Sequence, residues 1–135
     1  MEEFYRIMNV TKNGINRWRF EVRIDDRNSI FRGHFPGHPL VPGVCMMTMM
    51  SACAAKVSES AVEDHVKVVR TVKSCKLMHP LVPDYYQRLW IDVETDEPDF
   101  TASVYDTKYQ YATMCASFYG TQSYTPAKDV GEECQ

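Results

Sequence analysis

The chain has 135 residues, 44% of them hydrophobic, and a formal net charge of −3, which suits one domain with a real core and leaves no room for a second of ordinary size. No clustered basic stripe accompanies this balance, so we expect no nucleic acid partner, since phosphate binding needs concentrated Lys and Arg. Five cysteines without C-x-x-C spacing, and a first stretch without the layout of a signal peptide, predict a reducing compartment and hence a cytoplasmic location.

Two stretches near the start, residues 5–10 and 18–24, alternate apolar and polar side chains. Asn13-Gly14 lies between them and is a turn signal. The pattern predicts a β-hairpin.

Residues 32–45 form a loop that contains His34 and runs into an apolar stretch, with the sequence Arg-Gly-His-Phe-Pro-Gly-His-Pro-Leu-Val-Pro-Gly-Val-Cys. Its prolines fix φ, and its glycines permit backbone conformations closed to other residues. The chain would therefore hold His34 in one orientation, which makes it a candidate general base rather than a purely structural histidine. His38 is not expected to join it in a metal site, because Pro36 and Pro39 forbid the helical spacing that a His-x-x-x-His pair needs.

A helix is predicted from Gly43 to about Val57, with apolar residues all around it, which indicates burial on most sides. Pro42 and Gly43 interrupt the apolar run of residues 40–57, so we expect no membrane span, which would need about 18 apolar residues. The methionines of this helix are most simply core, although some could line a tunnel for an acyl chain.

Strands are predicted at residues 66–78, 88–94, 101–106 and 113–119, separated by turns at 80–84, 96–99 and 108–110. One long helix among mainly antiparallel strands predicts an α+β layer fold, with the helix packed on a curved sheet. We expect residues 1–120 to form this single domain and residues 121–135 to form a flexible tail.

Two segments carry a resemblance to a known family. Residues 33–44, Gly-His-Phe-Pro-Gly-His-Pro-Leu-Val-Pro-Gly-Val, resemble the active-site loop of the hotdog-fold 3-hydroxyacyl-[acyl-carrier-protein] dehydratases of type II fatty acid synthesis. Residues 76–84, Lys-Leu-Met-His-Pro-Leu-Val-Pro-Asp, resemble the later motif of that family, which usually reads Lys-Phe-x-x-Pro-Val-x-Pro-Gly-Asp. The resemblance implies a hotdog fold, in which a curved antiparallel sheet wraps a long buried central helix.

The resemblance also implies roles for individual residues. His34 would remove the α-proton of a 3-hydroxyacyl thioester, and the backbone N–H of Gly43 would polarise the thioester carbonyl. A helix N-terminus offers unsatisfied N–H groups and partial positive charge, which suits a developing enolate oxygen. The Leu40 carbonyl would accept the other ring N–H of His34 and fix its tautomer. No metal or cofactor is implied.

One position departs from the family. A Glu or Asp that protonates the departing hydroxyl usually stands fourteen residues after the histidine, and here that position is Thr48. No Asp or Glu occurs between Asp26 and Glu59, so a small shift of the alignment does not restore the acid. Thr48 is a poor acid, and Cys45, one turn earlier, is more simply a small buried hydrophobe. Thr48 is therefore expected only to line the substrate site.

In the family each site lies at a dimer interface, with the histidine from one protomer and the acid from the other. The resemblance thus implies an acyl carrier protein as partner and self-association as a dimer or trimer of dimers. A heterodimer with an acid-bearing paralogue could complete one site. Three functions stay open at this point: a hydroxyacyl-carrier dehydratase, a hotdog acyl thioesterase, and a non-catalytic acyl-binding subunit.

Overall fold

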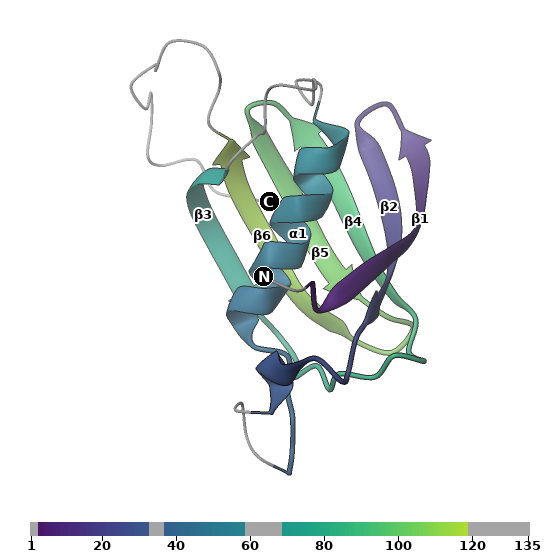
Figure 1. Ribbon diagram of the computed structural model, residues 1–135. Helices are drawn as coiled ribbons and strands as arrows, with labels where there is room; N and C mark the ends of the chain where they lie inside the picture. Colours follow the sequence, from purple (N-terminus) through teal and green to yellow (C-terminus); the bar gives the residue numbers. More distant parts are fainter. Residues whose placement is uncertain (1–2, 33–36, 59–68, 119–135) are drawn as a thin grey trace.

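The computed structural model describes residues 3–32, 37–58 and 69–118, and in them one α-helix lies across one face of a six-stranded sheet (Figure 1). The elements in chain order are β1 (Tyr5–Gly14), β2 (Arg17–Ile24), the 3₁₀ helix η1 (Ser29–Phe31), α1 (Gly43–Val57), β3 (Val69–Leu77), β4 (Leu89–Asp96), β5 (Asp99–Tyr105) and β6 (Gln110–Phe118). This is the α+β arrangement that the sequence predicts.

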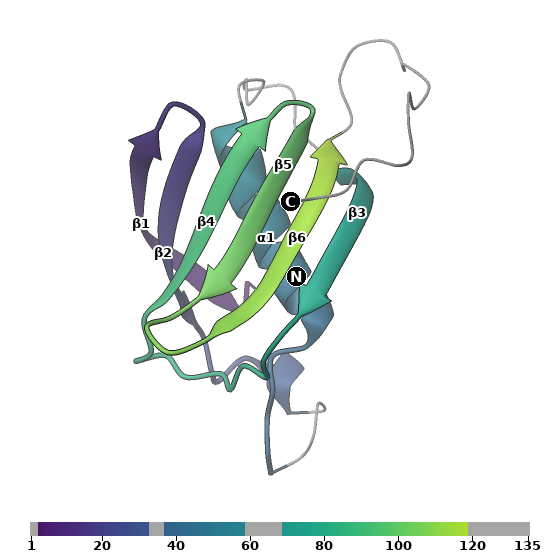
Figure 2. The ribbon, with the colours of Figure 1, turned by 180° about the vertical axis from the view of Figure 1, so that it is seen from behind.

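The sheet has the strand order β1-β2-β4-β5-β6-β3, and every neighbouring pair is antiparallel. β1 and β3 therefore form its two ends. α1 packs chiefly against the central strands β4 and β5. Seen from behind, the opposite face of the sheet is not covered by any helix of the described residues (Figure 2).

The predicted hairpin of β1 and β2 is confirmed, but its turn lies two residues later than Asn13-Gly14. Gly14 still belongs to β1 and pairs with Arg17, so the turn is made by Ile15 and Asn16. The physical reason is a register shift between Lys12 and Gly14. A bulge takes up one extra residue there, and glycine tolerates that geometry at little cost.

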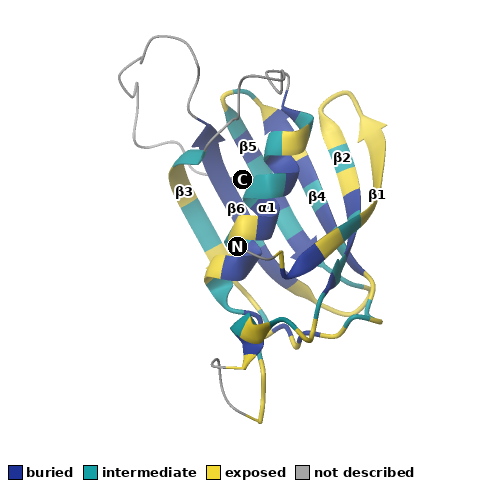
Figure 3. Ribbon diagram, in the orientation of Figure 1, coloured by how far each residue is buried: buried dark blue, intermediate teal, exposed yellow. Residues whose placement is uncertain are grey.

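The helix begins and ends where the sequence predicts, at Gly43 and Val57. Its burial is more one-sided than predicted, because Val44 is 67% exposed and Thr48 is also exposed. Figure 3 shows both buried and exposed stretches along α1. The sheet covers only one face of the helix, so the buried residues follow the helical repeat: Cys45, Met46, Met49, Met50, Cys53 and Ala54.

The strands after the helix are confirmed with small shifts of their ends. The strand predicted over residues 66–78 appears as β3 from Val69 to Leu77. Its first residues, like the tail expected at 121–135, lie outside the described residues, so that boundary of the domain stays a prediction.

The core fills the space between α1 and the inner face of the sheet. Inward side chains alternate along each strand, as in Leu89, Ile91 and Val93 of β4, which are at most 1% exposed. Phe100 and Phe118 stack with ring centroids 4.6 Å apart.

The outer face of the sheet is polar. Two ion pairs join β2 to β4: Arg17 with Glu94 at 3.3 Å and Arg19 with Asp92 at 3.0 Å. A third joins Glu21 of β2 to Arg88, the residue just before β4, at 3.1 Å. Such exposed pairs contribute little each to stability. They identify a face that is adapted to water.

Candidate functional site at the N-terminus of the central helix

The first turn of α1 carries backbone N–H groups for which the described residues provide no acceptor. Pro42 is the N-cap, and proline has no side-chain oxygen with which to cap a helix. Its carbonyl accepts the N–H groups of Cys45 and Met46 at 2.9 and 3.2 Å. The N–H groups of Gly43 and Val44 have no hydrogen-bond partner in the part of the chain that is described. This end of the helix can therefore bind an oxygen that carries negative charge.

The two motifs of the sequence come together at this helix end. The Val41 N–H donates to the Leu81 carbonyl at 2.8 Å. A Cβ on Gly43 would lie 2.7 Å from Cδ1 of Leu77, so Leu77 packs directly on the backbone of Gly43. The close packing is possible because residue 43 is glycine.

Thr48 lies one turn further along the same helix and is exposed. Its hydroxyl donates to the Val44 carbonyl at 2.9 Å, so its proton is already used inside the helix. No acidic residue occurs in the first turn of α1. The helix itself thus provides no group that could protonate a leaving hydroxyl.

Cys45 does not replace the missing acid. It is 3% exposed, and burial raises the pKa of its thiol above the ordinary value. A thiol that holds its proton more tightly in an apolar environment is a poor proton donor.

The remaining predicted residues are placed as follows. His34 lies outside the described residues, so its position as a base stays a prediction. Leu40 is half-buried in the segment that leads to Val41, and His38 is exposed. The described residues contain no group of His, Cys, Asp and Glu side chains that could hold a metal ion.

Leu77 is the site residue that sequence reasoning did not single out. The only signal was its place in the second motif, where the family usually has Phe. Nothing in the sequence indicates that the end of a later strand would pack on the start of the helix.

The connection that carries Leu81 is braced by the turn between β5 and β6. The N–H of Met78 donates to the Tyr111 carbonyl at 2.8 Å, and the His79 ring stacks on Tyr109 with centroids 3.8 Å apart. Asp106 organises the turn by accepting hydrogen bonds from its neighbours: Lys108 N and Tyr109 N at 2.7 Å, and the Tyr111 hydroxyl and Gln87 Nε2 at 2.5 Å. Burial alone would raise the pKa of Asp106, but these hydrogen bonds outweigh it and hold the pKa below its usual value.

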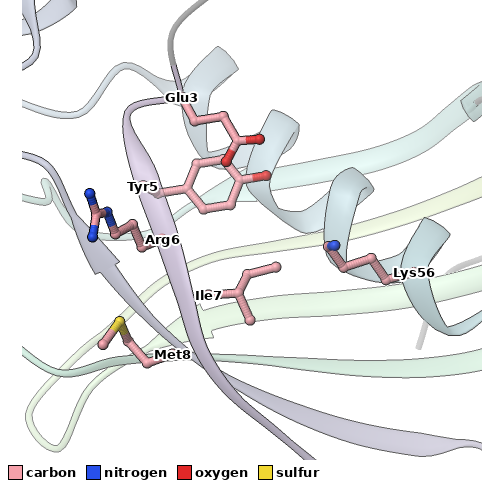
Figure 4. A pocket seen from close by; sticks show the side chains of 6 residues that line it. All are labelled: Glu3, Tyr5, Arg6, Ile7, Met8 and Lys56. Atoms are coloured by element: carbon pink, nitrogen blue, oxygen red, sulfur yellow. The ribbon is translucent and has the colours of Figure 1, made fainter.

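A separate pocket of about 490 Å³ lies between β1 and the last turn of α1 (Figure 4). It is lined by Glu3, Tyr5, Arg6, Ile7, Met8 and Lys56. Burial, with smaller effects of Cys53 and Glu3, raises the pKa of Tyr5 to about 12, so its phenol stays neutral and is no base near pH 7. Lys56 is at the opposite end of the helix from Gly43, so this pocket is not the predicted site.

Residues 10–117 match the ApeI-like family, described as ApeI dehydratase. The chain belongs to this dehydratase family. Curated relatives named 3-hydroxyacyl-[acyl-carrier-protein] dehydratase FabZ are also similar. The protein from Acidiphilium cryptum is 39% identical over 70 residues, which cover 49% of this chain and 42% of that relative. The protein from Gluconobacter oxydans is 29% identical over 99 residues, or 67% of this chain and 59% of that relative. The matches thus span less than two thirds of these relatives.

Solved structures confirm the hotdog fold of this family member. The dehydratase heterocomplex ApeI:P from Xenorhabdus doucetiae matches with a TM-score of 0.71 at 18% identity, covering 87% of this chain and 98% of that chain. A putative thioesterase from Lactococcus lactis matches with a TM-score of 0.55 at 7% identity, and the match covers 89% of this chain and 95% of that chain. At such identities the likeness extends to the fold alone. No helix among the described residues is long and apolar enough to cross a membrane.

Proposed function

We propose that this family member acts on 3-hydroxyacyl thioesters of an acyl carrier protein and forms trans-2-enoyl thioesters in fatty acid or related acyl-chain synthesis. The observation that carries the proposal is the pair of N–H groups at Gly43 and Val44, at the start of a buried helix, which find no acceptor within residues 3–32, 37–58 and 69–118. The names of the FabZ relatives support the substrate class.

The proposed reaction begins with proton removal. His34 takes the α-proton, and the electron pair of that C–H bond moves toward the thioester carbonyl. The oxygen then carries negative charge, which the Gly43 N–H and the positive end of the helix stabilise. When the electron pair returns to form the C2–C3 double bond, the hydroxyl on C3 leaves and needs a proton to depart as water. General acid help of this kind is worth about 10²–10⁴-fold in rate.

This chain does not supply that proton from α1, because the Thr48 hydroxyl is bonded to the Val44 carbonyl. We propose that the acid comes from a second protein, an acid-bearing paralogue whose helix pairs with this one. The Xenorhabdus protein with the same fold is described as a dehydratase heterocomplex, which supports such an assembly. The second candidate, an acyl-binding subunit without catalysis, is favoured by the same Thr48 bond. We place the protein in the cytoplasm.

The test is the conversion of a 3-hydroxyacyl carrier thioester to the enoyl thioester, followed by mass spectrometry. We expect the chain alone to be nearly inactive and Thr48→Glu to raise turnover by about 10²-fold or more, because Glu restores the acid. His34→Ala in the Thr48→Glu background should abolish the gain. Lys56→Glu, which adds a carboxylate at the far end of the same helix, is the matched control and should stay inactive.

Two outcomes contradict the proposal. Turnover that persists after His34→Ala removes His34 as the base. Full activity of the unmodified chain removes the reason to invoke a partner. An inactive Thr48→Glu variant that still binds the thioester supports the subunit function instead.

A further inference from the structure

Leu77 lies at the end of β3, next to the start of α1. It pairs with Ala112 of β6 on one side. Its two methyl groups lie 2.7 and 3.5 Å from the point where a Cβ of Gly43 would be. The side chain is therefore in contact with the backbone of the residue whose N–H lacks a partner.

In spite of this contact, Leu77 is 58% exposed, and Val44, the residue after Gly43, is 67% exposed. An exposed Leu or Val is ordinary by itself, but here the apolar surface lies next to N–H groups that have no acceptor among the described residues, so both are open to a ligand. A ligand with a polar oxygen attached to an apolar chain satisfies both. An acyl thioester has this structure.

The position of the Gly43 N–H indicates which part of the acyl chain would lie near Leu77. A carbonyl oxygen bonded to the Gly43 N–H lies about 3 Å from that nitrogen. The carbon next to the carbonyl, C2, is only two bonds from that oxygen. Carbons near the carbonyl, such as C2, are therefore the part of the acyl chain expected nearest to a side chain that contacts Gly43.

We propose that Leu77 is a specificity-determining residue, whose side chain packs against C2 of the acyl group and excludes substrates that carry a branch there. The inference rests on the proposed function, because it takes the thioester carbonyl to bind at Gly43. It adds that this site selects against 2-methyl acyl groups. A difference of one methyl group in such a pocket changes affinity about 10–200-fold.

The test uses two small thioesters, S-butyryl-pantetheine and S-2-methylbutyryl-pantetheine, and the full chain labelled with ¹⁵N. Binding is followed through the amide resonances of Gly43 and Val44, which requires no turnover. We expect the wild type to bind the straight thioester at least about tenfold more tightly, and Leu77→Ala to reduce the difference to about threefold or less. Val10→Ala, at an exposed apolar residue on β1 at the other end of the sheet, is the matched control and should keep the wild-type ratio.

The outcomes separate this inference from the proposed function. If neither thioester shifts Gly43, the proposed thioester site itself is wrong. If both bind the wild type equally, or Leu77→Ala keeps the wild-type ratio, the thioester site stands and the role of Leu77 is wrong. If Leu77→Ala changes only the molecular mass by light scattering, Leu77 belongs to a contact between chains, and the inference is also overturned.

Discussion

Gly43 and Leu77 are in close contact, so the effects of their substitutions on the free energy of unfolding should not be additive. Gly43→Ala places a Cβ 2.7 Å from Cδ1 of Leu77, and the leucine must move. In a Leu77→Ala background that space is empty. We expect Gly43→Ala to lower the free energy of unfolding by about 0.5–2 kcal/mol more in the wild type than in the Leu77→Ala background. Urea unfolding of the four proteins in this cycle measures the coupling, and additive values would show that the contact is relaxed at no cost.

The sequence predicts the role of a residue where a local motif determines the backbone. It does not predict a role that depends on contact with a residue far away in the chain. Gly43 could be predicted, because Pro42 before it and an apolar run after it define a helix start. The bond from the Thr48 hydroxyl to Val44 could not, since Thr occupies alternative rotamers in helices. Leu77 was missed because its importance arises from contact with a residue thirty-four positions earlier in the chain.

At the scale of elements, the turn between β5 and β6 depends on Asp106. Asp106→Ala removes the acceptor of two backbone N–H groups and of the Tyr111 hydroxyl, and we expect the free energy of unfolding at pH 7 to fall by about 1–3 kcal/mol. The lowered pKa of Asp106 means that its contribution is present above pH about 4 and is lost as the pH falls through the native pKa.

Chemical denaturation at neutral and acidic pH tests this prediction. The difference in the free energy of unfolding between the wild type and Asp106→Ala should become smaller at acidic pH. Asp96→Ala, at the exposed last residue of β4, is the control and should lower the free energy of unfolding by no more than about 0.5 kcal/mol. Equal effects of the two substitutions would mean that Asp106 contributes no more than a solvated side chain.

The sequence predicted the ends of the helix better than the exposure of its side chains or the position of the hairpin turn. The ends of α1 follow from local signals, whereas its exposed face at Val44 and Thr48 could not be predicted, because a single sequence does not show how far a sheet covers a helix. The shifted hairpin turn has a similar cause. Asn13-Gly14 is a strong local signal, but pairing along the strands, such as Lys12 with Trp18, places the turn two residues later.

At the scale of the whole molecule, β3 is an end strand of the sheet, with Val72 exposed on it and Met78 and Val82 exposed after it. An open edge of this kind favours pairing with another chain. We expect the protein to be dimeric or larger in solution and Val72→Lys to shift it toward the monomer. Val10→Lys on β1, at the other end of the sheet, should leave the mass unchanged.

Size-exclusion chromatography with light scattering distinguishes these cases. A monomeric wild type, or dissociation by Val10→Lys instead of Val72→Lys, would show that β3 is not the associating edge. The sequence predicts association only through the resemblance. Which strand is left at the edge depends on the order of strands in space, and single-sequence patterns do not contain that order.

The hydrogen bond from Val41 to Leu81 has a consequence for the order in which the chain folds. Its two residues are forty positions apart, and it fixes the segment just before α1 to the connection between β3 and β4. The helix can form from local contacts, whereas this bond requires the connection after β3 to be in place. Contacts of such long range form slowly. We therefore expect the end of α1 that offers its unpaired donors to be completed late in folding.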